Sequence, residues 1–291
     1  MRWIAFLVLP LSIALPLGNC ADDPEQLAKQ KATALSNARK CDVANPALVE
    51  TDNLFVTGDL PEEKLKTLAA YAQKQFGTTL KSLKFEMTEN PPKGKLAIYF
   101  FSERKKFAAF VGELSNERIE KDERGRMEPR ANEPYIAVSV APGEKPTDLD
   151  VEAAHQIAIA LLACKAGPAE LPGWMKDGFA RSMMWRLDTA TGSKERAQIR
   201  KMVLAVKGKM PVYKAMDIWT GSLDAEKKLL GASLMEYFVF GPDSAKFSKI
   251  LANFRPTDDV RTPTIATALM ATEIKPEDLD KAWKKWVTTG K

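Results

Sequence analysis

The only histidine of the chain, His155, lies in the segment VEAAHQIAIALL, and an acid, Asp177, follows in the segment LPGWMKDGFA. Two histidines four residues apart on a helix, a glutamate beside the first and an acid on a later helix form a known zinc site. Such residues bind Zn²⁺ and activate its water for hydrolysis. Any metal chemistry therefore has to start from His155, but one histidine cannot supply a pair.

His155 fits the pattern H-E-x-x-H in two registers. In the first register His155 is the second histidine, Glu152 is the general base, and Val151 occupies the position of the first ligand. In the second register His155 is the first histidine, Gln156 replaces the base, and Ile159 replaces the second ligand. In both registers the residue one helical turn from His155 is aliphatic, so the clamp of two imidazoles is lost.

The segments Glu152–Ala158 (EAAHQIA) and Pro172–Ala180 (PGWMKDGFA) resemble the peptidase-MA-like group of gluzincins, the thermolysin-type zinc metallopeptidases. Secreted bacterial members of that group read roughly H-E-A-T-H-Q-x-A and P-x-W-x-x-E-G-x-A. The match favours the first register and implies a zincin-like fold. It places Val151, His155 and Asp177 at former metal-ligand positions and makes Glu152 the remnant of the general base. Looser matches are the segments NLFVTGDL, KLAIYFF and LDKAWKKWV.

Two departures from the family pattern predict that hydrolysis is lost. Val151 stands at the first ligand position, and Asp177 is one methylene shorter than the usual glutamate. His155 and Asp177 supply at most two of the three protein ligands of a catalytic zinc site, which lowers the metal affinity. We therefore expect no metal cofactor and an inactive Glu152. A direct hydrogen bond between His155 and Asp177 is expected in place of the metal bridge.

The sequence thus predicts a degenerate gluzincin, a pseudopeptidase whose former cleft binds a peptide or protein segment. In that family a substrate adds as a β-strand to a sheet edge beside the histidine helix. The alternative is an active zinc metallopeptidase with an altered site, in which Glu152 is the base, His155 and Asp177 are ligands and a third ligand comes from elsewhere. A purely structural envelope protein without a ligand is the third interpretation.

Residues 1–21 are typical of an export signal, with Arg2 before an apolar stretch at 3–17. This stretch is shorter than the roughly 20 residues of a membrane span, and its two prolines would break a spanning helix. We expect a secreted, periplasmic or cell-envelope protein with no transmembrane span in the mature chain. The segment LGNC also resembles a lipoprotein cleavage site, and lipidation of Cys20 is the less favoured interpretation.

The cysteines allow two arrangements. Cys41 and Cys164 could form one disulfide in an oxidising compartment, and two unpaired buried thiols are the alternative. Loss of Arg2 with the signal lowers the formal net charge from +5 to +4, and acids and bases are interspersed. No basic stripe with aromatics appears, so we expect no nucleic-acid partner. The mixed-charge cluster at 117–130 is predicted to be a solvated loop.

Periodicity and turn residues predict an α+β fold with two lobes: residues 22–148 form a mixed α/β lobe with an N-terminal helix and a small sheet, and residues 149–291 form a mostly helical lobe. Strands are predicted at 51–57, 95–101 and 135–140. Helices are predicted at 24–39, from Pro61 to an end at Gly77, and at 103–111, 149–164, 172–187, 194–206, 224–240, 244–254, 262–270 and 276–287. The histidine helix is expected at the seam between the lobes.

Overall fold

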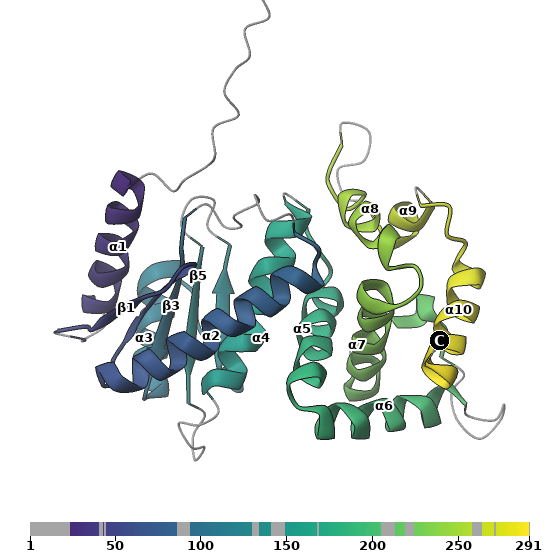
Figure 1. Cartoon of the computed structure of the whole chain (residues 1–291), viewed down its shortest axis with the longest axis horizontal. Coiled ribbons are helices and arrows are strands. Elements are labelled where there is room, and N and C mark those ends of the chain that lie inside the picture. The colour runs from purple at the N-terminus through teal and green to yellow at the C-terminus, as the bar shows by residue number, and fades with distance from the viewer. Residues whose placement is uncertain are drawn as a thin grey trace, which may run out of the picture.

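The computed structural model describes residues 24–40, 43, 45–85, 94–129, 134–140, 149–167, 169–204, 213–218, 224–257, 264–270 and 272–290. The protein is α+β, as predicted, with a mixed five-stranded sheet in the N-terminal half and helices in the C-terminal half (Figure 1). The predicted signal at 1–21, with Cys20, and the residue Cys41 lie outside the described residues. Across the described ranges, each helix is too short or too polar to cross a bilayer.

The sheet has the strand order β1-β2-β3-β5-β4. Its three central strands are parallel, and each edge strand is antiparallel to its neighbour. The central strands match the apolar segments from which they were predicted, because a parallel sheet covered on both faces needs continuous apolar runs. The bounds are β1 (Leu48–Glu50), β2 (Leu54–Gly58), β3 (Leu96–Phe101), β4 (Gly125–Glu128) and β5 (Tyr135–Ser139).

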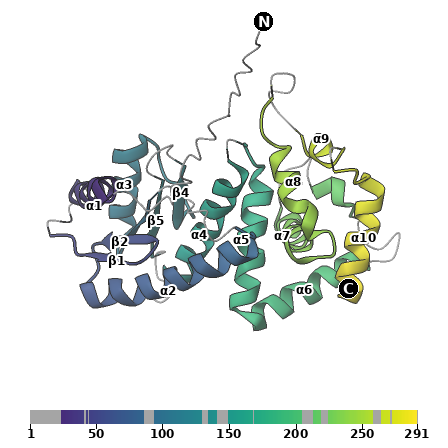
Figure 2. The same ribbon diagram turned by 45° about the horizontal axis from the view of Figure 1, so that its top comes forward.

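Helices cover both faces of the sheet, and alternate strand residues belong to different cores. Leu54, Ile98 and Ile136 pack in the core that contains residues of α2 (Glu62–Ser82) and α4 (Leu149–Ala166). Their neighbours Phe55, Tyr99 and Tyr135 pack with residues of α1 (Pro24–Arg39) and α3 (Arg104–Ser115). Figure 2 shows α1 and α3 on one side of the strands and α2 on the other. This period-two division is what a sheet between two helical layers requires.

The helical half is organised around α7, in which every residue from Leu229 to Val239 is buried. Gly178 permits the close approach of the preceding helix α5, because a Cβ there would lie 2.9 Å from the carbonyl oxygen of Gly231 on α7. Trp283 ties the last helix to α7 by donating from Nε1 to Ser233 Oγ (3.2 Å). The bounds are α5 (Gly173–Leu187), α6 (Thr189–Val203), α7 (Ala225–Phe240), α8 (Phe247–Ala252), α9 (Ile265–Met270) and α10 (Pro276–Thr289), with 3₁₀ turns η2 (Ala215–Ile218) and η3 (Ser244–Lys246).

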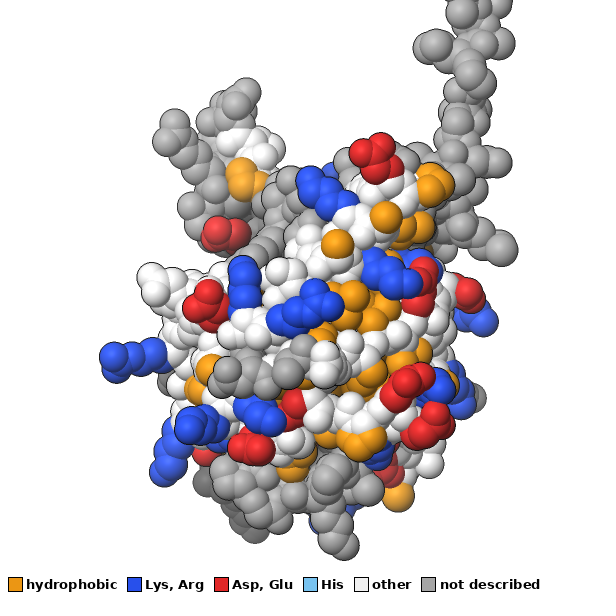
Figure 3. All heavy atoms as spheres, turned by 90° about the vertical axis from the view of Figure 1, so that its left-hand side faces the viewer, with side chains coloured by type: hydrophobic (Ala, Val, Ile, Leu, Met, Phe, Trp, Pro, Cys, Tyr) orange, Lys and Arg blue, Asp and Glu red, His pale blue; other side chains and the backbone are white. Residues whose placement is uncertain are grey.

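The surface carries both signs of charge side by side. On the α1 side of the molecule, lysine and arginine side chains alternate with acidic ones, and apolar side chains are exposed between them (Figure 3). Lys31 and Lys95, for example, both pair with Glu50 at the edge strand β1 (3.0 and 2.8 Å). On this face, therefore, basic side chains have acidic neighbours, as the interspersed sequence predicts.

Some predicted helix bounds are wrong; α6, for example, begins at Thr189 and not at residue 194. Helix α2 does not end at Gly77 but continues to Ser82, because the next turn still packs on the core. Thr79 and Leu83 are both buried at this end. Glycine lowers helix stability without breaking the hydrogen-bond ladder, so tertiary packing of one further turn outweighs it.

Gly77→Ala is expected to stabilise the protein by about 0.5–1 kcal/mol, since alanine is the better helix former at an interior position. A Cβ at Gly77 would meet no atom within 4 Å, so no clash opposes this gain. The free energy of unfolding from denaturant titration measures the change. A lower unfolding midpoint would show that α2 does not run through this position.

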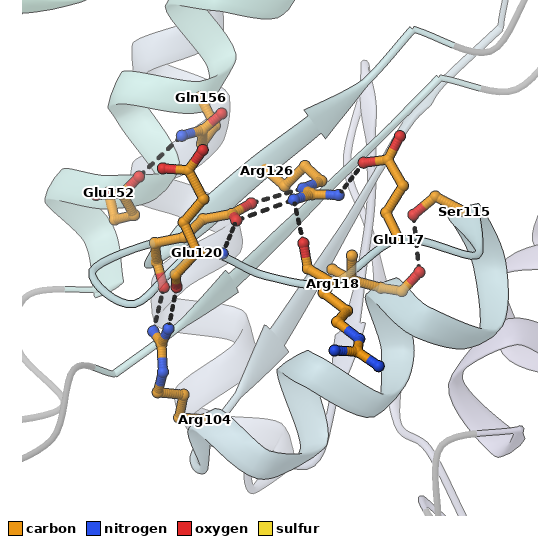
Figure 4. A network of polar contacts seen from close by, with 10 residues as sticks. Arg104, Ser115, Glu117, Arg118, Glu120, Arg126, Glu152 and Gln156 are labelled. Carbon is orange, nitrogen blue, oxygen red and sulfur yellow. Dashed lines mark hydrogen bonds and ion pairs between the residues drawn. The ribbon is translucent and has the colours of Figure 1, made fainter.

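The second correction concerns residues 117–130, predicted as a solvated loop. The segment contains the edge strand β4. Its charges are neutralised locally: Arg126 pairs with Glu123 through Nε (2.6 Å) and with Glu117 through Nη1 (2.6 Å) (Figure 4). Charge content therefore did not exclude a strand, because an edge strand keeps one side open to solvent.

Candidate functional site

Helix α4 presents two different surfaces. Ala153, Ile157 and Leu161 are fully buried toward the sheet and α2, whereas Val151 is 51% exposed and His155 is partly buried. The helix is apolar nearly all round because it packs against the sheet, α2 and α5 together. A 51% exposed valine on such a helix marks the surface that the packing leaves open.

A cleft of about 760 Å³ opens beside Val151 and His155. It lies at the seam where the helical half meets the sheet half, with walls from α2, the residue before β4, α4, α5 and α6. The lining residues are Tyr71, Arg124, Val151, His155, Arg181, Met184, Trp185, Leu187, Asp188, Thr191 and Glu195.

The wall from α5 and α6 is fixed by one carboxylate. Glu195 accepts from Arg181 Nε (2.8 Å) and Nη2 (2.7 Å) and from Trp185 Nε1 (2.5 Å). Burial raises the pKa of Glu195, but the hydrogen bonds from Arg181 and Trp185 outweigh burial and lower it below the ordinary value. The Arg196 guanidinium lies 5.4 Å from the centre of the Trp185 ring. This wall is thus an internally neutralised and ordered surface.

Glu152 faces the edge strand. Its Oε1 accepts from Gln156 Nε2 (2.9 Å), and a Cβ added at Gly125 of β4 would lie 2.5 Å from the same oxygen (Figure 4). Glu152 is not among the residues that line the cleft. The absence of a side chain at Gly125 therefore lets β4 pass directly over Glu152 and Gln156.

The loop before β4 is held by two arginines from different elements. Arg104 of α3 donates to the carbonyl oxygens of Glu120 and Glu123, and Arg126 of β4 itself binds Glu123 and Glu117. The backbone ladder with β5 also extends beyond β4, since Ser139 N donates to Arg124 O (2.8 Å). These contacts hold the loop and the start of β4 in place (Figure 4).

The two registers of the H-E-x-x-H pattern differ in where the structure places their residues. Val151 and His155, one helical turn apart, line the same cleft, which is the arrangement of the first register. Ile159 of the second register is packed against the core, and Gln156 is buried against Glu152. The two positions of the first register thus share one open surface, and those of the second do not.

The expected contact between His155 and Asp177 is wrong. Within the described part of the chain, these two residues form no hydrogen bond with each other, and Asp177 is exposed. The residue that α5 places in the cleft is Arg181, one turn after Asp177. Asp177 and Arg181 are i and i+4 residues on one side of α5. Asp177 therefore misses the cleft by one turn along the helix axis, an offset that sequence spacing alone does not fix.

The predicted disulfide is not formed in this structure. Cys164 is a free thiol, and burial raises its pKa to about 11, which makes it a poor nucleophile. Its expected partner Cys41 lies outside the described residues. The pairing therefore stays a prediction for the oxidised protein.

The donor set at the cleft does not fit a catalytic zinc ion, which needs three protein ligands. In the described ranges no group of three His, Cys, Asp or Glu side chains is placed to hold a metal ion. Of the two acids that line the cleft, Glu195 binds Arg181, and Asp188 caps α6 by accepting from Ala190 N and Thr191 N (both 3.1 Å). These carboxylates are engaged in holding the wall of the cleft.

Several cleft residues had no signal in the sequence. Tyr71, Arg124, Arg181 and Glu195 come from four different elements and form no motif with His155. Trp185 is buried, and it also borders the cleft. Tertiary packing alone brings these residues together.

Comparison with known proteins adds no relative: no family model matches the chain, and no curated protein matches it. The resemblance to gluzincins therefore rests on the two segments that contain His155 and Asp177.

Proposed function

We propose that this protein is an exported, non-hydrolytic gluzincin-like protein whose cleft beside α4 binds an extended peptide segment. One observation carries the proposal: Val151, at a former ligand position, is exposed in a cleft that extends to the start of the edge strand β4. In this proposal the former catalytic site lacks one metal ligand, whereas the neighbouring surface can still bind a peptide strand.

The loss of hydrolysis follows from the chain's single histidine. Valine has no donor atom, so His155 has no imidazole partner one turn away on α4. Water that is bound to no metal keeps its high pKa, and a carboxylate such as Glu152 cannot activate it efficiently. In place of a ligand, Val151 supplies an apolar contact surface.

The peptide is proposed because of the strand edge. Within the described residues β4 pairs only with β5, so its other side offers backbone N–H and C=O groups to a further strand. The cleft next to it exposes apolar side chains from Val151, Met184 and Leu187. Backbone pairing with β4 and apolar contacts in the cleft together favour an extended segment with an apolar side chain.

Val151→Arg is expected to weaken peptide binding at least about tenfold, because a charged chain would replace an apolar contact beside Arg124 and Arg181. The probe is the best-binding member of an array of short peptides, labelled with a fluorophore and followed by fluorescence polarisation. Leu204→Arg is the matched control, since Leu204 is 60% exposed but lies outside the cleft. It should leave binding unchanged.

Backbone N-methylation of the same peptide at alternate residues should also abolish binding, because strand addition needs its N–H groups. If Val151→Arg and Leu204→Arg reduced the peptide affinity equally, the cleft would not be the binding site. If the peptides were cleaved in added zinc and Glu152→Gln abolished the cleavage, the protein would be an active peptidase.

A further inference from the structure

A second cavity lies in the helical half, away from the cleft. It holds about 260 Å³ between α6, α7 and α10, which contact one another pairwise. Its walls are Arg196, Ile199, Arg200, Ser233, Glu236, Trp286, Val287 and Gly290. In Figure 1, α6 runs below α7 and α10 at the end of the molecule farthest from the sheet. At ~30 Å³ per water this space equals about nine waters, enough for a small organic molecule.

Positively charged side chains outnumber negatively charged ones at this cavity. Glu236 of α7 is a buried carboxylate that accepts from Arg196 Nε (3.1 Å) and Nη2 (2.5 Å), and Arg186 Nη2 lies 3.6 Å from it. Burial lowers the pKa of Arg186; Glu236 opposes this, and the positive charge of Arg196 adds to it. Among the lining residues, Arg196 and Arg200 carry positive charge and Glu236 is the one carboxylate, so the excess positive charge favours an anion.

Hydrogen-bond donors exceed acceptors at the cavity. Arg200 donates from Nε to the carbonyl of Val287 (3.3 Å), and among the described residues its two Nη groups have no recorded acceptor. Ser233 is 3% exposed and its Oγ accepts from Trp283, so its hydroxyl hydrogen is a further donor at the wall. The carboxylate of Glu236 is already used by Arg196. A ligand for this cavity must therefore bring acceptor oxygens.

The rest of the wall is apolar. Ile199 is buried, and Trp286 stands edge-on to the buried ring of Tyr237, with 5.9 Å between the ring centres. Val287 completes this side. An ion alone, such as phosphate, would leave these apolar groups without a partner, so the lining fits a ligand with one anionic end and one flat apolar end.

We propose that the cavity between α6, α7 and α10 binds a small carboxylic acid with a flat apolar group. Its carboxylate lies between Arg200 and Ser233, and its apolar group packs on Trp286 and Val287. This site uses none of the residues that line the cleft, so it stands or falls independently of the proposed peptide binding.

Three probes with one skeleton test the sign of the charge: phenylacetate, phenylacetamide and phenethylamine, titrated into the full chain by isothermal calorimetry. A ligand of about ten heavy atoms is expected to bind with a Kd between about 1 µM and 1 mM. The amide should bind at least about tenfold more weakly than phenylacetate, and the amine should not bind. Equal affinity of acid and amide, or no heat from phenylacetate at millimolar concentration, overturns the proposal.

Arg200→Gln should weaken phenylacetate at least about tenfold and leave the amide unchanged. Arg200 is exposed, so this variant is expected to fold, which circular dichroism checks. The matched control is Lys201→Gln, because Lys201 is the next residue on α6, is equally exposed and does not line the cavity. Equal losses in both variants would reduce the effect to general surface charge and reject the site.

Discussion

Val151→His is expected to raise the affinity of the protein for Zn²⁺ by about 100-fold or more, since it supplies a second imidazole one helical turn from His155. Val151 is exposed in the cleft one turn from His155, so both imidazoles can reach one ion without displacing a core residue. Adding Asp177→Glu should bring no further gain, because Asp177 is exposed and does not line the cleft.

Competition with a chromophoric zinc indicator measures the affinity of each variant. Two histidines at this spacing bind zinc weakly on any exposed helix, so the control is Ala70→His/Lys74→His on α2, where both residues are exposed. If Val151→His binds zinc no better than this control, the cleft does not favour a metal and the family interpretation loses its geometric support. A further gain from Asp177→Glu on top of Val151→His would show that residue 177 reaches the ion, although Asp177 does not line the cleft here.

Gly58→Ala is expected to destabilise the protein by about 3 kcal/mol or more. Gly58 ends β2 with φ +151°, and a Cβ there would lie 1.9 Å from the carbonyl oxygen of Phe100 on the neighbouring strand. The clash is with backbone in the centre of the sheet, so no side-chain rotation can relieve it. Denaturant titration gives the free energy of unfolding.

Gly77→Ala is the counterpart for this change, because it makes the same substitution in open space on α2. The two variants should shift the unfolding midpoint in opposite directions. A Gly58→Ala protein of wild-type stability would mean that β2 and β3 are farther apart at this end than the register Gly58↔Phe100 places them.

Helices and strands can be predicted from the sequence where their apolar side chains indicate burial. The strand β3 and the helix α4 were found because continuous apolar residues specify burial on both faces or all round. The edge strand β4 was not predicted, because charged residues such as Arg126 and Glu128 indicated a solvent-exposed loop. The ion pairs of Arg126 form only in the folded protein. Local composition does not predict a strand that depends on pairing with another strand.

The candidate site was predictable to a similar extent. Spacing placed Val151 and His155 on one surface of a helix, because i and i+4 residues are neighbours. It did not place Asp177, since the position of α5 along its own axis relative to α4 is set by tertiary packing, such as that of Gly178 on Gly231. The cleft wall of Arg181, Trp185 and Glu195 likewise depends on how α5 meets α6, which no local pattern contains.

Two consecutive residues of α6 lie near Trp185: Glu195, which lines the cleft, and Arg196, which lines the second cavity. Glu195 accepts the indole N–H at the cleft, while Arg196, which lies near the same ring, reaches into the cavity. A ligand that displaced Arg196 would therefore also disturb the packing of the Trp185 ring in the wall of the cleft. By thermodynamic linkage, a ligand in the second cavity would change the affinity of the cleft by the same factor as a ligand in the cleft would change the affinity of the cavity.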